Sequence, residues 1–479
     1  MPQAWPPASK ERHFDASGYF SNRTIAALCT PTGGAICIVR VSGPQALGIA
    51  RSLSGHAFDQ GDHRRAKRCW ISDSSGHKID DAVLLPFFGP NSFTGEDSVE
   101  LFLHGSPMIA QKVLDAAYEL GARLALPGEF SFRAVKNGKM LLSQAEAVKE
   151  LVSAENDFSL ELALEKLAGS QHELVDRIRG DLLQLCTLSE VGIDFSDQDV
   201  DEVSLPRLKE RLAPILQRLR NLKESFGRGQ RFLDGVPVTL FGLPNAGKSS
   251  FFNALLGEDR SIVSNIEGTT RDVVRERLNL RGPAGQVTLR LSDTAGLRKS
   301  ADQIEEIGME RTLKAAAESD IVVVVVDGLR TEVEKLGEYL KRIESPARSL
   351  LFVVSKRDLL QDQELERVQG LLNRGFPGAR VMSASAQTLE GVHEVAEALA
   401  QLAGERLSRK PGEVVLTRVE HVRAVEAALE SLSRAGAALD LVLFATDVRH
   451  AMNDLGPLIG ETIPDDILGK IFSDFCIGK

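Results

Sequence analysis

The chain has 479 residues, of which 43% are hydrophobic and 26% are charged, and its formal net charge is -10. Globular domains commonly hold about 100 to 200 residues, so this length predicts about three domains, and the ordinary composition excludes extended disorder and fibrous folds. The acidic balance disfavours indiscriminate nucleic-acid binding, because phosphate contacts need a local excess of Lys and Arg, so an RNA partner needs a local patch or another protein.

The N-terminal segment 1–23 is predicted to be a loose tail, because it has two adjacent prolines and lacks the apolar stretch of a secretory signal. Glu11, Asp15 and the scarcity of arginine argue against a mitochondrial transit peptide. The longest aliphatic run, 321–326, is too short to cross a bilayer. The cysteines are odd in number and form no CxxC pair, which favours reduced thiols over disulfides or a zinc site. We therefore expect a soluble protein of the cytoplasm with no membrane contact.

Residues 24–141 show a mixed pattern that predicts a compact α+β domain. Strands are expected at 35–41 and 99–103, and an apolar helix at 109–120. The basic stretch 63–68 is either a solvated loop or a local patch for RNA.

Residues 142–231 and 404–479 are predicted to form one helical domain that is interrupted by an insertion. Apolar residues recur at spacings of three, four or seven, which places them on helical faces that need partners. They are Leu160, Leu164, Leu167, Leu174, Ile178, Leu182, Leu185 and Leu188, then Leu208, Leu212, Ile215, Leu219, Leu222 and Phe226, and finally Val419, Val422, Val425, Leu429 and Leu432.

The insertion, residues 232–403, is predicted to be a doubly wound α/β domain. Strand-like segments at 236–241, 287–291, 321–326 and 350–354 alternate with helical patterns. The continuous apolar run at 321–326 is typical of a parallel strand that is buried on both faces.

A phosphate-binding loop follows the first strand of this insertion. Residues 242–249, GLPNAGKS, match GxxxxGK[ST], and a helical pattern follows them. Backbone N–H groups of such a loop surround phosphate oxygens, Lys248 would reach the β and γ phosphates, and Ser249 would bind Mg²⁺.

Three later motifs, in the order that GTPases share, predict GTP as the nucleotide. Thr270 in GTTRD offers a second hydroxyl to Mg²⁺. In DTAG, Asp293 can contact the metal through a water, and the backbone N–H of Gly296 can contact the γ phosphate. The motif 355–358, SKRD, then supplies the guanine-binding Asp358, and Ser385 with Ala386 completes the base pocket. The motif usually reads NKxD, so Ser355 is expected to weaken one contact to the base or the P-loop. The GTP-binding candidates are Asn245, Ala246, Gly247, Lys248, Ser249, Ser250, Ser264, Asn265, Ile266, Glu267, Gly268, Thr269, Thr270, Asp293, Thr294, Ala295, Gly296, Ser355, Lys356, Arg357, Asp358, Ser385, Ala386 and Gln387.

The residue that follows DTAG is Leu297, which cannot orient an attacking water as the Gln of Ras-like proteins does. Another group must therefore assist hydrolysis. Asn245 could help to hold a monovalent cation against the phosphates, where its charge would stabilise the transition state. Alternatively, Asn245 is a turn residue chosen for its backbone geometry.

Together the motifs GLPNAGKSS, GTTRD and DTAGLR and the terminal DDILGKIFSDFCIGK resemble the MnmE (TrmE) family of tRNA-modification GTPases, from about Ile36 to Lys479. The resemblance implies potassium-stimulated hydrolysis, with K⁺ bound by Asn245, Ser264, Ile266 and Thr269. It also implies that Glu305 orients the attacking water, whereas the residues alone indicate only that Glu305 and Glu306 are charges at a helix start.

The resemblance further implies an N-terminal domain that forms the homodimer and binds a 5-formyl- or 5,10-methylene-tetrahydrofolate through Arg40, Glu100, Lys139 and Lys479. An FAD-containing MnmG (GidA) protein is the implied partner, in a heterotetramer that adds a carboxymethylaminomethyl or aminomethyl group at carbon 5 of a tRNA wobble uridine. Cys476 is either a buried structural residue or the chemically active cysteine of the family's tail.

A different class of GTPase is an alternative. An Era-like, GTP-switched assembly factor would bind ribosomal RNA through an appended basic module. Residues 404–479 instead contain more Asp and Glu than Lys and Arg, which disfavours that alternative.

Overall fold

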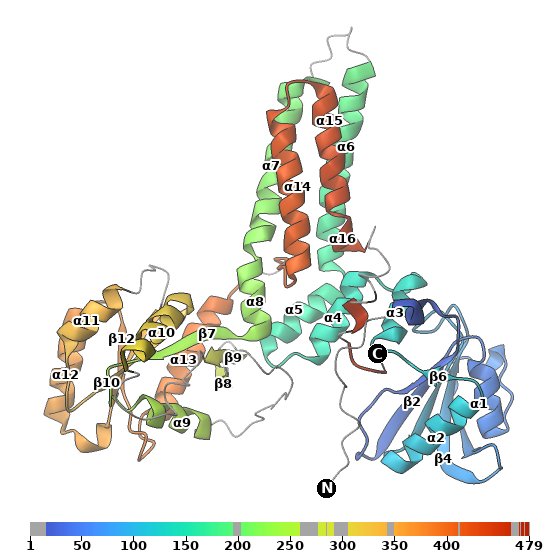
Figure 1. Ribbon diagram of the computed structural model, residues 1–479, viewed down its shortest axis with the longest axis horizontal. Helices are drawn as coiled ribbons and strands as arrows, with labels where there is room; N and C mark the ends of the chain where they lie inside the picture. Colours follow the sequence, from blue (N-terminus) through green and yellow to red (C-terminus); the bar gives the residue numbers. More distant parts are fainter. Residues whose placement is uncertain are drawn as a thin grey trace. The chain divides into compact units, whose positions relative to one another are not determined.

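The computed structural model describes residues 16–194, 203–258, 276–283, 285–291, 305–342, 349–410, 412–460, 469, 471–473 and 475–478. The chain divides into two compact units, 1–149 with 455–479, and 150–454. The architecture is multidomain α/β, as the sequence predicts (Figure 1). Within these described ranges, no helix has the length and apolar character needed to span a bilayer.

The first unit contains a six-stranded sheet with the order β3-β4-β5-β2-β1-β6. Its neighbouring strands are antiparallel except β1 and β6, which are parallel. The strands are β1 Ile25–Leu28, β2 Ile36–Ser42, β3 Lys67–Ser72, β4 Lys78–Phe87, β5 Ser98–His104 and β6 Arg123–Leu124. Helices α1 Ala46–Ser54 and α2 Pro107–Glu119 bury one face of this sheet, where Val39, Leu84 and Leu101 are fully buried.

The opposite face of the same sheet carries apolar side chains that remain partly exposed. Because side chains alternate along a strand, Phe102 shares this face with its register partners Ile38 and Val83. All three are only partly buried, and Ile36 and Trp70 are 61% and 50% exposed. Helix α3 Glu129–Lys136 covers the β1 end of this face, where Phe130 packs on Ile25 and Ala27.

The C-terminal segment packs on this first unit. Phe472 and Phe475 join a buried cluster with Phe132 and Leu142, the first residue of α4 Leu142–Val152. The backbone N–H of Gly128 donates to the carbonyl oxygen of Cys476 at 3.1 Å. Helix α16 Gly456–Ile459 belongs to the same unit. The tail is therefore fixed beside the start of α3.

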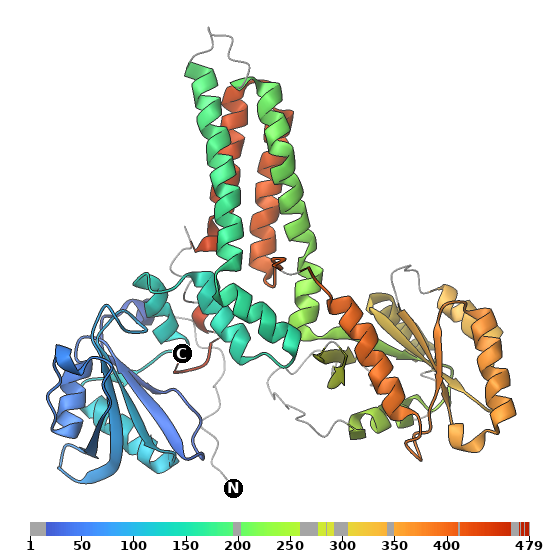
Figure 2. The same cartoon turned by 180° about the vertical axis from the view of Figure 1, so that it is seen from behind.

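The second unit contains a four-helix bundle of α6 Ser170–Asp194, α7 Leu205–Glu224, α14 Val419–Ala437 and α15 Leu441–Asp454 (Figure 2). The bundle joins segments from before and after the nucleotide-binding motifs. The prediction assigned all of residues 404–479 to this helical domain, whereas residues 455–479 belong to the first unit. Its core contains the predicted residues Ile178, Leu182 and Leu185 on α6 and Leu208, Leu212, Ile215, Leu219 and Leu222 on α7.

Three of the predicted core positions are wrong. Leu160 and Leu164 are 41% and 49% exposed, because α5 Asp157–Leu167 ends before Gly169, whose φ of +98° breaks the helix, and α6 restarts in a different phase. Val419, at the first position of α14, is 47% exposed as well.

The remaining part of the second unit is a six-stranded sheet with the order β12-β11-β10-β7-β9-β8. All neighbouring strands are parallel except β8 and β9. The strands are β7 Val236–Phe241, β8 Glu276–Gly282, β9 Gly285–Leu291, β10 Ile321–Asp327, β11 Ser349–Ser355 and β12 Arg380–Ser383. Residues 321–326 are buried throughout, which confirms the predicted double-faced burial.

Helices cover both faces of this sheet. One face packs on α9 Lys248–Glu258 and α13 Val392–Leu407, and the other on α10 Glu305–Glu318, α11 Val333–Lys341 and α12 Asp362–Gly375. Helix α8 Phe226–Asp234 leads into β7, and Arg231 on α8 pairs with Asp320 before β10. Because β7 leads directly into the P-loop, this ion pair anchors the start of the strand that positions the phosphate-binding loop.

Candidate nucleotide-binding site

The P-loop connects the carboxyl end of β7 to the N-terminus of α9. A Cβ atom on Gly242 would lie 2.4 Å from the carbonyl oxygen of Val325, so the loop passes too close to β10 for any side chain. Asn245 and Gly247 have φ values of 60° and 86°. The loop therefore turns tightly at the end of α9 that has a positive partial charge, which is the arrangement that binds phosphate.

Lys248 lies along the inside of this loop. Its Nζ donates to the carbonyl oxygens of Gly242 and Leu243, both at 2.8 Å. An ammonium in this position can exchange carbonyl oxygens for phosphate oxygens without leaving the loop. Ser249 follows in the first turn of α9, where a hydroxyl can reach a metal bound to the phosphates.

The guanine-motif carboxylate and the last predicted motif meet at the carboxyl ends of β11 and β12. Ser385 donates its hydroxyl to Oδ1 of Asp358 at 2.5 Å, although 27 positions separate them. The same hydroxyl oxygen accepts the backbone N–H groups of Gln387 and Thr388 at 3.2 and 3.1 Å. Asp358 is thus oriented by a side chain that is itself fixed to its loop.

A cavity of about 420 Å³ lies beside the P-loop, between residues 243–246, the end of β10 and the start of α11, with Lys356 of the guanine motif in its wall. Its size suits a small-molecule ligand, for which pockets of roughly 300 to 1,000 Å³ are usual. Lys356, at a φ of 58°, closes one side through an ion pair from Nζ to Oδ2 of Asp327 at 2.8 Å. The lining residues are Leu243, Pro244, Asn245, Ala246, Val325, Val326, Asp327, Leu329, Arg330, Glu332, Leu336 and Lys356.

Ser355 contacts the P-loop. Its hydroxyl lies 2.7 Å from the carbonyl oxygen of Ala246 and 3.1 Å from that of Val326. A serine hydroxyl is therefore long enough to contact the P-loop, and the weakening of one contact to the base or the P-loop stays a prediction.

Several predicted site residues lie outside the described residues: Ser264, Asn265, Ile266, Glu267, Gly268, Thr269, Thr270, Asp293, Thr294, Ala295, Gly296, Leu297 and Lys479. Glu305 is the first residue of α10, and its side chain is not described. The assignments of these residues to Mg²⁺, K⁺, folate and the attacking water stay predictions.

Two of the predicted folate residues form an ion pair in the first unit. Nη2 of Arg40 lies 2.7 Å from Oε1 of Glu100, directly across β2 and β5. The guanidinium also lies over the rings of Phe93 and Phe130, at 5.1 and 5.4 Å from their centroids. The exposed Lys139 lies against Gly95, in the loop that precedes β5.

Cys476 is an exposed free thiol, so its interpretation as a buried structural residue is wrong. It differs from three other cysteines in this respect. Burial raises the pKa of the thiols of Cys37, Cys69 and Cys186, which makes them poorer nucleophiles at neutral pH.

Two cations of the basic stretch 63–68 are paired with nearby carboxylates. Lys67 pairs with Asp62 at 2.6 Å, and Arg68 pairs with Asp81 at 2.5 Å. The predicted solvated loop is wrong for residues 67–68, which begin β3, and the pairing of these two residues disfavours a patch for RNA.

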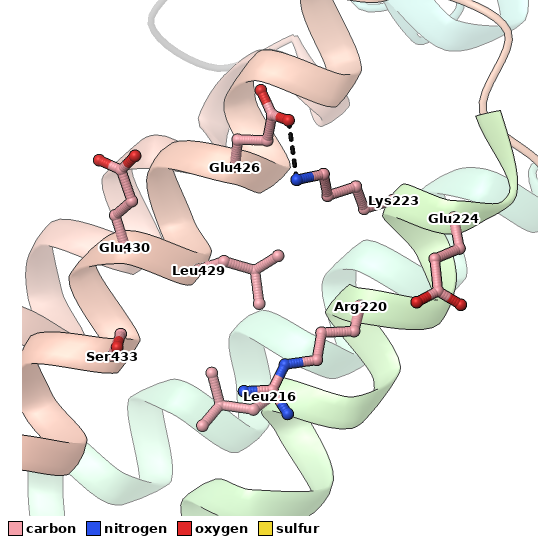
Figure 3. A pocket seen from close by; sticks show the side chains of 8 residues that line it. All are labelled: Leu216, Arg220, Lys223, Glu224, Glu426, Leu429, Glu430 and Ser433. Atoms are coloured by element: carbon pink, nitrogen blue, oxygen red, sulfur yellow. Dashed lines mark ion pairs between the residues drawn. The ribbon is translucent and has the colours of Figure 1, made fainter. Parts of the chain in front are cut away.

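A larger cavity of about 580 Å³ lies on the outside of the bundle, between α7 and α14 (Figure 3). An ion pair between Lys223 and Glu426 at 2.9 Å bridges it. Its lining mixes both signs of charge and contains none of the predicted site residues: Leu216, Arg220, Lys223, Glu224, Glu426, Leu429, Glu430 and Ser433. The smaller cavity, by contrast, is lined by Asn245, Ala246 and Lys356 of the predicted site.

A phosphate-cradling loop between a parallel strand and a helix, with an oriented carboxylate at the same edge of the sheet, defines a GTP-hydrolysing enzyme of the P-loop class. Comparison with known proteins adds the family. Residues 142–476 match the model of the MnmE helical domain, and residues 24–139 match that of the GTP-binding protein TrmE N-terminus.

The tRNA modification GTPase MnmE of Christiangramia forsetii is 36% identical over 485 residues, which cover 96% of this chain and 99% of the relative. The MnmE of Azoarcus sp. is 40% identical over 457 residues, which cover 95% and 98%. This chain belongs to the MnmE family of tRNA modification GTPases, which confirms the resemblance seen in its motifs. Among solved structures, the G domain of the T. maritima FeoB iron transporter is 28% identical, over 35% of this chain and 98% of that one, with a TM-score of 0.24.

Proposed function

We propose that this chain is a potassium-stimulated GTP hydrolase that acts in tRNA wobble-uridine modification. In this proposal, the carboxymethylaminomethyl or aminomethyl group at carbon 5 is added together with an FAD-containing MnmG-type partner in a heterotetramer. The main support is the nearly full-length match to tRNA modification GTPases, combined with the P-loop and guanine pocket of the second unit. GTP hydrolysis would drive domain motion, and the modification chemistry would take place elsewhere.

The residues around the P-loop fit a nucleotide with a divalent metal. Gly242 leaves no space for a side chain, Lys248 donates to two carbonyl oxygens of the loop, and Ser249 is the second residue of α9. We propose that Ser249 and Thr270 hold Mg²⁺, which would neutralise charge on the β and γ phosphates. The residues of the protein then position the γ phosphate and a water.

The proposed potassium dependence rests on Leu297, which cannot bind water, and on Asn245 in the wall of the cavity. We expect hydrolysis to be at least about 10-fold faster in potassium than in sodium at equal ionic strength, because a fitted cation stabilises the charge that develops in the transition state. Turnover of GTP in the two salts is the measurement. Equal rates would contradict the proposal.

Two variants separate a cation ligand from a turn residue at position 245. Asn245 has a φ of 60°, so Asn245→Ala removes the amide and strains the backbone, whereas Asn245→Gly removes the amide and keeps the backbone relaxed. Both variants should lose the potassium response if the amide holds the cation. A retained response in Asn245→Gly would show that position 245 serves only the turn.

The first unit offers residues that fit a reduced folate. The guanidinium of Arg40 can pair with a glutamate carboxylate of the cofactor, and Glu100 can accept N–H groups from the pterin edge. The rings of Phe93 and Phe130 lie beside Arg40, and the hydrogen bond from Gly128 to Cys476 holds the tail two residues before Phe130. We propose that a 5-formyl- or 5,10-methylene-tetrahydrofolate bound here supplies the one-carbon unit. Lys139 and Lys479 would also contact the folate, and Cys476 would take part in the chemistry.

A homodimer through the N-terminal unit is part of the proposal. The half-exposed sheet face around Ile38, Val83 and Phe102 supports it, because a contiguous apolar face on a soluble domain commonly marks a protein interface.

Nucleoside analysis of tRNA from a strain that lacks this chain tests the proposed function. We expect the wobble modification to be absent and to return with the wild-type chain, but not with Lys248→Ala, which removes the cation of the P-loop. An Era-like factor predicts intact wobble nucleosides and a defect in ribosomal subunits instead. Normal wobble nucleosides in the deletion strain would therefore overturn the proposal.

A further inference from the structure

The most informative departure from the GTPase motifs is Ser355, where NKxD proteins have Asn. Ser355 is the last residue of β11 and is 5% exposed. It pairs in register with Asp327, the last residue of β10, and its side chain faces the P-loop. The residue thus lies between the phosphate-binding loop and the base-binding motif.

The hydrogen-bonding capacity of Ser355 is already used by the protein. A hydroxyl has one proton to donate, and two carbonyl oxygens compete for it, that of Ala246 at 2.7 Å and that of Val326 at 3.1 Å. An Asn amide at the same position has two N–H groups, so it can hold the loop and still donate to a ligand. Ser355 retains the first of these roles and has no proton left for the second.

The turn of the P-loop at Gly247 lies close to Ser355. A Cβ atom on Gly247 would lie 3.5 Å from the Ser355 hydroxyl and 3.6 Å from its Cβ, which is ordinary contact distance. The short side chain therefore lies against the turn of the P-loop and ends there. Ala246, which accepts this hydroxyl, and Lys356, the next residue along the chain, both line the cavity beside the P-loop.

Guanine presents two edges that need different partners. Its N1–H and N2–H groups are donors, which a carboxylate such as Asp358 accepts, whereas N7 and O6 are acceptors and need a donor. Residue 355 is the motif position with an amide in other GTPases, and here it cannot donate to N7. Recognition of the base then depends on its N1–H and N2–H edge, which faces Asp358. Ser385 orients the Asp358 carboxylate.

We propose that Ser355 is a specificity-determining residue that holds the P-loop and leaves guanine N7 without a donor from this position. The enzyme then accepts guanine nucleotides that lack the N7 acceptor, such as 7-deaza-GTP, as well as it accepts GTP. Recognition of the other edge is unaffected, so inosine and adenine nucleotides remain poor ligands.

Affinities for GDP and 7-deaza-GDP test the proposal on the purified full-length chain. We expect their dissociation constants to agree within about 2-fold, because no net hydrogen bond to N7 is lost. Steady-state hydrolysis of GTP and 7-deaza-GTP should show the same parity in kcat/KM. A preference of the wild type for GDP of about 5-fold or more would overturn the proposal, since it would reveal another donor or an ordered water at N7.

Two substitutions at this position provide the internal controls. Ser355→Asn should restore a donor and make the enzyme prefer GDP over 7-deaza-GDP by about 3- to 10-fold, as one net hydrogen bond predicts. Ser355→Ala loses the loop contact, so both affinities should fall together and their ratio should stay near one. A folded Ser355→Asn variant without the preference, or a changed ratio in Ser355→Ala, would contradict the assignment.

These measurements need only nucleotide and are independent of the proposed tRNA reaction. A failed N7 test leaves the proposed function in place, and normal wobble nucleosides in the deletion strain would leave the N7 test valid. If either variant fails to fold, the ratio of the wild-type dissociation constants for GDP and 7-deaza-GDP decides the proposal by itself.

Discussion

Replacing Asp358 by Asn should transfer the preference of this GTPase from guanine to xanthine nucleotides. The Asp358 carboxylate can accept both N–H groups of the guanine edge, and xanthine has a carbonyl oxygen in place of the 2-amino group. The Asn amide can donate to that oxygen, whereas guanine then loses charge-assisted bonds worth about 1.5 to 3 kcal/mol each. We expect GTP affinity to fall by about 100-fold or more and XTP to become the better substrate, measured by competition binding and by hydrolysis of both nucleotides.

The hydrogen bond from Ser385 makes this substitution a clean test. Its hydroxyl donates to Oδ1 of Asp358 at 2.5 Å, and the Asn carbonyl oxygen can accept the same bond, so the side chain keeps its orientation. Ser385→Ala is the matched control, because it removes the orienting hydroxyl and keeps the carboxylate. It should weaken GTP binding without any gain for XTP. An unchanged preference for GTP in Asp358→Asn would mean that the guanine pocket lies elsewhere.

The parts of the fold that were predictable from the sequence are those with strong local patterns. The run 321–326 is apolar at every position, and it forms β10, buried on both faces of the parallel sheet. In the first unit, β1 has the short sequence IAAL, and β3 and β4 mix charged with apolar residues. None of these three strands was predicted, because β1 is short and β3 and β4, which form a hairpin with each other, lack a continuous apolar run.

The wrong core positions have a similar cause. Leu160 and Leu164 keep helical spacing with Leu167 and Leu174, but a single glycine at 169 changes the phase between α5 and α6. Spacing alone cannot reveal this break, since the apolar residues remain three, four or seven apart across it.

The candidate site, too, was predictable where its residues are contiguous in the sequence and not where they are far apart. The P-loop is contiguous in the sequence, so its motif predicts its position between β7 and α9. The bond from Ser355 to Ala246 joins residues 109 positions apart, and the ion pair of Arg40 with Glu100 joins residues 60 apart. The register of β2 and β5 creates the ion pair, whereas the bond to Ala246 depends on the path of the P-loop past the end of β11. Only the family resemblance indicated that Arg40 and Glu100 share a site.

The second large effect is expected for Glu305, the proposed water-positioning residue. Glu305→Ala would remove an interaction made mainly in the transition state, so turnover should fall by roughly 100-fold while GTP affinity stays within about 2-fold of the wild type. Single-turnover hydrolysis and equilibrium binding measure the two quantities separately. A water held by another residue predicts nearly normal turnover instead.

Glu306→Ala is the matched control, because α10 begins at Glu305 and both carboxylates lie at its first two positions. A negative charge at a helix N-terminus stabilises the helix by about 0.3 to 1 kcal/mol, so a purely structural role predicts a similar small drop in melting temperature for both variants, with turnover nearly intact. A role in catalysis predicts that only Glu305→Ala is slow. Equal losses of activity in the two variants would show that the charge of this helix start matters, and that Glu305 does not position the water.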